Sequence, residues 1–96
     1  MQVIAHEPYF WFFLQHNNNY YLDVNCSYSF VGYNRLIQLN ETEVKEYLER
    51  GTTYINELAN EIQYSLQPTY SERHLMGEID DLVHQAITEF NATKDK

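Results

Sequence analysis

The sequence predicts an α+β fold, in which an N-terminal antiparallel sheet of three strands packs against two or three C-terminal helices. Residues 1–40 are rich in aromatic and asparagine side chains and contain runs with the two-residue period of strands. Residues 41–96 instead repeat apolar positions at the three- and four-residue spacing of helices. Charge divides at the same point. The first segment holds two acids and one base, and the second holds twelve acids and five bases, for net charges of −1 and −7.

The first expected strand covers residues 9–15 and is apolar on both faces. One face carries Phe10, Phe12 and Leu14, and the other carries Tyr9, Trp11 and Phe13. A strand that faces solvent on one side normally alternates apolar with polar residues. This strand is therefore either central and covered on both sides, or it exposes an aromatic face. Residues 16–19 follow as a turn, because asparagine tolerates the left-handed backbone of tight hairpins.

Two further strands are expected over residues 20–26 and 33–39, which completes a meander within residues 1–40. In the first of them Leu22, Val24 and Cys26 point to one side, and Tyr21, Asp23 and Asn25 to the other. The apolar side suits the core of the protein. We therefore expect Tyr21 and Asp23 to be exposed, and Cys26 to be a buried and unreactive thiol.

Asn40 predicts the start of the helical half, because it forms the capping-box pattern with Glu43. The apolar stripe that follows stays in phase across Gly51 as far as Leu66. This continuity favours one helix over residues 41–66. Gly51 and the threonine after it also fit the end of one helix and the start of another.

A last helix is expected beyond Pro68, with Ser71 as its cap and an apolar stripe that ends at Phe90. Along it, two pairs of side chains lie four residues apart and share a helical face: His74 with Glu78, and Asp80 with His84. A zinc site would need a third protein ligand. We interpret these pairs as solvated side-chain pairs and expect no metal.

Length, charge and cysteine content exclude several classes of function. The 96 residues are expected to form a single domain, 1–96, with one modest core and no separate cofactor lobe. The net charge of −8 opposes binding to nucleic acid and to anionic membranes. Cys26 is the only cysteine, so neither an intrachain disulfide nor a cysteine zinc site can form. With no secretory leader visible and no apolar run longer than six residues, we expect a cytoplasmic protein.

No motif of an enzyme is present. The serines lack the Gly-x-Ser-x-Gly turn of a hydrolase, and three glycines do not form a phosphate-binding loop. Asp80 and Asp81 are adjacent, so on a helix they point about 100° apart and cannot act on one substrate atom. We therefore expect no catalytic activity and no cofactor. The one enzyme hypothesis left open uses Cys26 as a nucleophile with a histidine as base.

Two features point to protein binding. The first is an acidic helical surface opposed by Arg73, formed by Glu57, Glu61, Glu72, Glu78, Asp80, Asp81 and Glu89. Such charge also serves solubility, but like charges four residues apart repel, and a surface that keeps them suits a basic partner. The second is a surplus of aromatic side chains in the sheet. If helices cover one face only, tyrosine and tryptophan on the other face form an exposed platform; the alternative is an ordinary aromatic core.

Three runs, EPYFWFF at 7–13, YYLDVNC at 20–26 and VGY at 31–33, precede this acidic helical half. In size, acidity and order of elements the chain resembles the small bacterial immunity proteins that accompany contact-dependent inhibition and related polymorphic toxins. The resemblance implies a cytoplasmic inhibitor that binds a cognate toxin, often a basic nuclease, and occludes its active site. It carries over no individual family residue.

The hypothesis from sequence is therefore a non-enzymatic inhibitor of a basic toxin domain. The expected partner-binding residues are Glu57, Glu61, Glu78, Asp80, Asp81, Trp11, Tyr21, Asp23 and Tyr33. The carboxylates would pair with lysine and arginine of the partner or mimic phosphates, and the aromatic side chains would act as anchors. The alternatives are a phage-type inhibitor or nucleic-acid mimic, and a homodimer or larger homo-oligomer formed through the aromatic sheet face.

Overall fold

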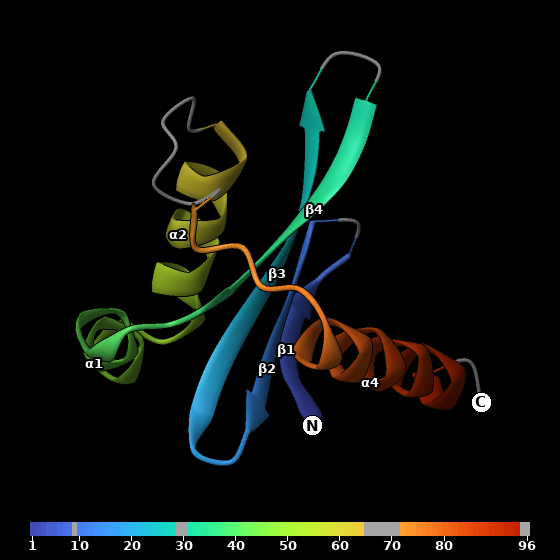
Figure 1. Cartoon of the computed structure of the whole chain (residues 1–96). Helices are drawn as coiled ribbons and strands as arrows, with labels where there is room; N and C mark the ends of the chain where they lie inside the picture. Colours follow the sequence, from blue (N-terminus) through green and yellow to red (C-terminus); the bar gives the residue numbers. More distant parts are fainter. Residues whose placement is uncertain (9, 29–30, 65–71, 95–96) are drawn as a thin grey trace.

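The computed structural model describes residues 1–8, 10–28, 31–64 and 72–94, with the backbone alone described at 26–28, 31–33 and 94. These residues form seven elements (Figure 1): β1 Gln2–Glu7, β2 Trp11–His16, β3 Asn19–Tyr28, β4 Val31–Gln38, α1 Glu41–Arg50, α2 Thr52–Tyr64 and α4 Glu78–Lys94. The strands make one antiparallel sheet in the order β1-β2-β3-β4. Figure 1 shows α1 and α2 on one side of this sheet and α4 on the other. The α+β class is confirmed, with four strands where three were predicted.

The additional strand is β1, which pairs with β2 along one edge of the sheet. Val3 pairs with Leu14 and Ala5 with Phe13, so Ile4 is an extra residue at a β-bulge. The bulge reverses the side to which later residues point, and it breaks the regular alternation by which a strand is recognised. This is the physical reason why the sequence pattern missed β1.

The turn between β2 and β3 forms as predicted. Asn17 and Asn18 both adopt positive φ values, of 51° and 68°. Positive φ at both central residues is the requirement of the two-residue hairpin turn whose twist matches that of the flanking strands. The turn sets the β2–β3 register, in which Phe13 lies opposite Leu22 and Phe12 lies opposite Asp23.

The sheet is covered on both faces, so the core has two halves. The half beneath α1 and α2, here called the α2-side core, consists of Trp11, Phe13, Leu22, Val24, Ile37, Leu39, Ile55, Leu58, Ala59 and Ile62. The half beneath α4, here called the α4-side core, consists of Leu14, Tyr21, Leu36, Val83 and Ala86. Of the two alternatives left open for β2, the central strand covered on both sides is the one observed.

The single helix predicted over 41–66 is wrong, because the chain breaks at Gly51 into α1 and α2. Gly51 has a φ of 69°, and its N–H donates to the carbonyl of Tyr47 at 2.7 Å, which ends α1. The apolar stripe stayed in phase because both helices face the same side of the sheet. The predicted capping box is confirmed: Asn40 Oδ1 accepts from the Glu43 N–H, and Glu43 Oε1 accepts from the Asn40 N–H, both at 2.9 Å.

The segment before α4 fastens to the free edge of β4. The Leu75 N–H donates to the Leu36 carbonyl at 2.8 Å, and the Leu36 N–H donates to His74 Nδ1 at 3.1 Å. These two bonds satisfy backbone groups that an open edge strand would leave exposed. α4 itself begins at Glu78, after Gly77 with a φ of 85°. It begins later than expected, and the predicted cap Ser71 lies outside the described residues.

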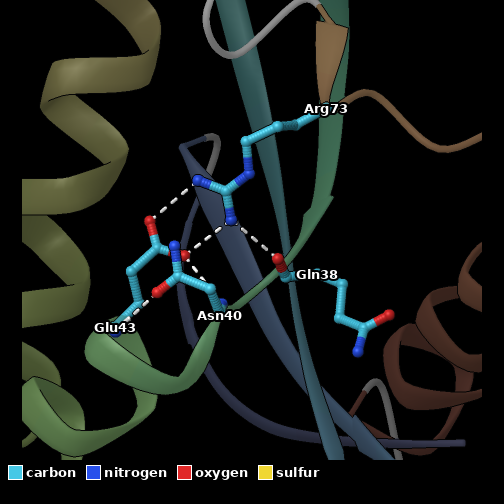
Figure 2. A network of polar contacts seen from close by, with 4 residues as sticks. All are labelled: Gln38, Asn40, Glu43 and Arg73. Atoms are coloured by element: carbon cyan, nitrogen blue, oxygen red, sulfur yellow. Dashed lines mark hydrogen bonds and ion pairs between the residues drawn. The ribbon is translucent and has the colours of Figure 1, made fainter.

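A polar network joins the same segment to α1 (Figure 2). The Arg73 guanidinium donates to both carboxylate oxygens of Glu43, at 2.6 and 2.9 Å, and to the carbonyl of Gln38 at 2.8 Å. Glu43 is buried, and it also belongs to the capping box with Asn40. A buried carboxylate is stable only when its charge is matched and hydrogen-bonded. Arg73 supplies both, and so ties the segment that precedes α4 to α1 and to the end of β4.

Candidate functional site

The acidic residues that were predicted to bind a partner lie in two layers, on opposite sides of the sheet. Glu57 and Glu61 belong to α2, whereas Glu78, Asp80 and Asp81 form the first turn of α4 across the sheet. Because the sheet separates the two helices, the structure does not bring these five carboxylates together. The acidic surface predicted from the sequence is two separate surfaces.

Arginine partly neutralises the acidic residues of the α1–α2 layer. Arg50 forms ion pairs with Glu57 and Glu46, and its guanidinium lies 5.5 Å from the centre of the Tyr54 ring. Arg73, expected to oppose the acidic surface, is held by Glu43 instead. Ion pairs as exposed as those of Arg50 add little stability, but they reduce the charge that α2 offers to a partner.

The carboxylates at the start of α4 are not neutralised in this way. Within the described part of the chain, neither lysine nor arginine forms an ion pair with Glu78, Asp80 or Asp81. Asp80 lies 3.8 Å from His84 Nε2, as the predicted pair requires. The other predicted pair is wrong, because His74 precedes the helix and accepts from the Leu36 N–H. The positive end of the helix dipole stabilises the three carboxylates, and they remain available to an external cation.

The aromatic platform predicted on the sheet is wrong. Trp11 is 4% exposed and lies beneath α2, where its Nε1–H donates to Asn56 Oδ1 at 3.2 Å. Tyr21 is 5% exposed beneath α4. Both faces are covered, so neither side chain can anchor a partner. The side chains of Tyr33 and Cys26 lie outside the described residues; their backbones pair with each other across β3 and β4.

Asp23 was expected to be exposed and is 4% exposed, beneath α4. It points away from Leu22 and Val24 as predicted, but α4 covers that side of the sheet. Its Oδ2 accepts a hydrogen bond from Asn34 Nδ2 at 3.3 Å. Burial raises the pKa of Asp23 to about 6, against smaller lowering effects of the Asn34 hydrogen bond and of His84 and a raising effect of Asp80.

A cleft of about 230 Å³ opens beside Asp23, between α4 and the sheet. It is lined by Phe10, Phe12, Asp23, Asn25, Asn34, His84 and Ile87. The walls are aromatic and aliphatic, whereas the carboxylate and the two amides are polar. Asn25, Asn34 and His84 are exposed, so the cleft reaches the surface at these residues. It lies next to the acidic first turn of α4, since Asp80 acts electrostatically on Asp23.

This arrangement is suited to binding a small cationic group. A buried carboxylate with a shifted pKa in a cleft is typical of functional sites. The cleft is smaller than the 300–1,000 Å³ usual for ligands of drug size, and the residues that line it include no serine, threonine or cysteine nucleophile. Among the residues with described placement, no group of three histidine, cysteine or acidic side chains could hold a metal ion.

Sequence reasoning placed Asp23 among the binding residues but missed its neighbours Phe10, Phe12, Asn25, Asn34, His84 and Ile87. One signal was present, in that Asp23 is a single acid within an apolar strand and lies opposite Phe12 once the hairpin register is fixed. The contribution of α4 carries no such signal, because it depends on where the helix docks.

Among the described helices, none is long and apolar enough to cross a membrane. Comparison of the chain with protein-family profiles, with curated protein sequences and with solved structures found no match.

Proposed function

We propose that this chain is a non-enzymatic protein-binding inhibitor: an immunity protein that neutralises a cognate basic toxin of the nuclease type by occluding its active site. One observation carries the proposal. The carboxylates of Glu78, Asp80 and Asp81 gather at the start of α4 with no lysine or arginine paired to them in the described chain. Other acids of the same protein, Glu43 and Glu57, have arginine partners.

The contrast between acids with and without an arginine partner identifies the α4 carboxylates as the proposed surface. Neighbouring carboxylates repel, and this repulsion is relieved when a positively charged surface approaches. A negative patch also accelerates encounter with a basic partner by electrostatic steering. A basic nuclease binds phosphates with lysine and arginine side chains. The α4 carboxylates would form ion pairs with these same side chains and so block phosphate binding.

The absence of catalysis is part of the proposal. Asp23 and His84 are the protonatable groups that line the α4 cleft, and the lining set includes no nucleophile for them to activate. The cleft is therefore better suited to holding a group of a partner than to transforming a substrate.

The test uses a candidate toxin domain encoded next to this protein. Toxin activity is measured with and without an equimolar amount of the chain, at moderate salt. We expect inhibition that weakens as salt rises, because the contact is electrostatic. Unchanged toxin activity at equimolar ratio would refute the proposal.

Two charge-matched variants locate the contact. The triple variant Glu78→Gln, Asp80→Asn, Asp81→Asn removes the α4 carboxylates, and the control Glu41→Gln, Glu49→Gln, Glu61→Gln removes three acids from the opposite layer. We expect the first to slow association by about tenfold or more, and the control to change it far less. Equal losses in the two variants would show that overall charge, and not α4, determines inhibition.

A further inference from the structure

We infer that the cleft beside Asp23 receives one arginine side chain of a protein partner, whose guanidinium pairs with the Asp23 carboxylate. The inference rests on the proposed function for the nature of the partner, and it assigns a specific contact to one place on the α4 face. The shared chemistry is that of a guanidinium cation, and the source to which we commit is a protein side chain.

The size of the cleft favours a single amino-acid side chain over a larger ligand. At about 230 Å³ it falls below the usual range of small-molecule pockets but offers room for one extended side chain. Phe10, Phe12 and Ile87 provide apolar surface for the methylene groups of that side chain. Phenylalanine rings also attract a cation that lies over their faces.

The carboxylate of Asp23 favours a positively charged group in the cleft. Asp23 is almost fully buried, and the one hydrogen bond that its side chain accepts within the described chain comes from Asn34. No described lysine or arginine forms an ion pair with it. A carboxylate buried in this way has lost its hydration without gaining a countercharge. A cation that entered the cleft would compensate the Asp23 carboxylate for the hydration that it lost on burial.

The same molecule shows how such a carboxylate is satisfied. Of the two buried acidic side chains in the described residues, Glu43 is held by both arms of the Arg73 guanidinium, which also donates to the Gln38 carbonyl (Figure 2). Asp23 is the other buried acid, and Asn34, which lines the same cleft, carries an amide oxygen that could serve as a further acceptor. The Oδ1 of Asn34 can accept while its Nδ2 donates to Asp23.

Arginine fits better than lysine because its planar guanidinium pairs with a carboxylate through two parallel bonds and stacks on aromatic rings. A protein source is favoured because the cleft lies beside the acidic first turn of α4. His84 lines the cleft and pairs with Asp80, one turn earlier in the helix. A basic surface that docks on this turn would bring an arginine to the opening.

The test does not require the toxin. The isolated protein is titrated with N-acetyl-arginine amide, and with the neutral analogue N-acetyl-citrulline amide, while the side-chain amides of Asn25 and Asn34 are followed by ¹H–¹⁵N NMR. We expect saturable shifts with the arginine compound at millimolar concentration, as befits one side chain, and weak or no shifts with citrulline. Equal responses to the two compounds would overturn the inference.

Two matched variants assign the site. Asp23→Asn keeps the shape of the side chain and should weaken arginine binding by about tenfold or more, because a charge-assisted hydrogen bond is lost. Glu49→Gln removes an equal charge from the exposed surface of α1, on the opposite side of the sheet, and should leave binding within about twofold. Equal weakening in both variants, or no saturable shift at the cleft, would contradict the inference.

The two proposals fail separately. If arginine does not bind but the chain still inhibits the toxin, only the arginine site is refuted. If arginine binds at Asp23 but the toxin is unaffected at equimolar ratio, the function as an inhibitor of that toxin is refuted while the chemistry of the cleft stands.

Discussion

The two faces of the sheet are built differently. The face beneath α1 and α2 is closed by apolar packing, and its buried tryptophan N–H has an internal acceptor in Asn56. The face beneath α4 has a smaller apolar core and contains the buried acid Asp23. It opens into a cleft beside carboxylates that have no lysine or arginine partner among the described residues. Burying an acid without a countercharge opposes folding. We therefore expect stability to reside mainly in the α2-side face, and we propose that binding resides in the α4-side face.

The largest expected effect tests the stabilising role of the α2-side face. Phe13 is fully buried, and its ring contacts those of Tyr20 and Tyr47. Phe13→Ala should lower the free energy of unfolding by about 3–5 kcal/mol, because it removes a large buried side chain and leaves a cavity. Urea denaturation measures this value. A loss below about 1 kcal/mol would show that the α2-side core does not dominate stability.

The next-largest effect concerns the loss of folding free energy caused by the buried charge of Asp23 beneath α4. The pKa of Asp23 rises from 3.8 in the unfolded reference to about 6 in the fold, so the folded state binds the proton more tightly. Its contribution to stability is present below pH 3.8 and is lost as the pH rises through about 6. Asp23→Asn should therefore stabilise the protein above this window, by on the order of 2–3 kcal/mol, and should change little below it.

Urea denaturation of both proteins across this pH range gives the difference directly. His84 and Asp80 of α4 are the titratable groups that act on Asp23, and both are unchanged in the variant. A variant that is less stable than the parent at neutral pH would mean that the Asp23 carboxylate stabilises the fold, and would remove the contrast between the faces.

A smaller effect is expected where a buried carboxylate does have a partner. Arg73→Met leaves Glu43 buried without a countercharge and should cost about 1–3 kcal/mol. The double variant Arg73→Met, Glu43→Gln should recover part of this loss, because the unpaired charge is gone. If the single variant proves as stable as the parent, the pairing of Glu43 gives no support to the comparison with Asp23.

An effect no larger than the last tests the break between α1 and α2. Gly51 has open space around it, but its φ of 69° and ψ of −150° belong to a region that favours glycine. Gly51→Ala should cost about 1–3 kcal/mol through backbone strain. Far-UV circular dichroism and urea denaturation would report it. A stabilised variant with more helix would indicate that one continuous helix over 41–66 can form after all.

Local signals were read correctly from the sequence. The turn at Asn17 and Asn18, the strands on either side of it, and the capping box of Asn40 and Glu43 depend on neighbouring residues alone. The errors arose where a local pattern is ambiguous. The bulge at Ile4 hides β1, and a stripe that stays in phase across Gly51 fits two helices on one face as well as a single helix.

The candidate site was only partly predictable, because it depends on tertiary placement. Tyr21 and Asp23 do point away from Leu22, as alternation requires, but nothing local to β3 says that α4 covers them. The pairing of Arg73 with Glu43 joins residues thirty positions apart in the sequence. Which carboxylates keep a free charge could be seen only once such distant partners were placed.

Hydrogen exchange of the protein, free and mixed with a candidate toxin domain, tests the central claim most directly. If binding resides on the α4-side face, the complex should slow exchange around Asp23 and in the first turns of α4, near Glu78 and His84, and leave α2 unchanged. Slower exchange confined to α1 and α2, with none at α4, would contradict the account.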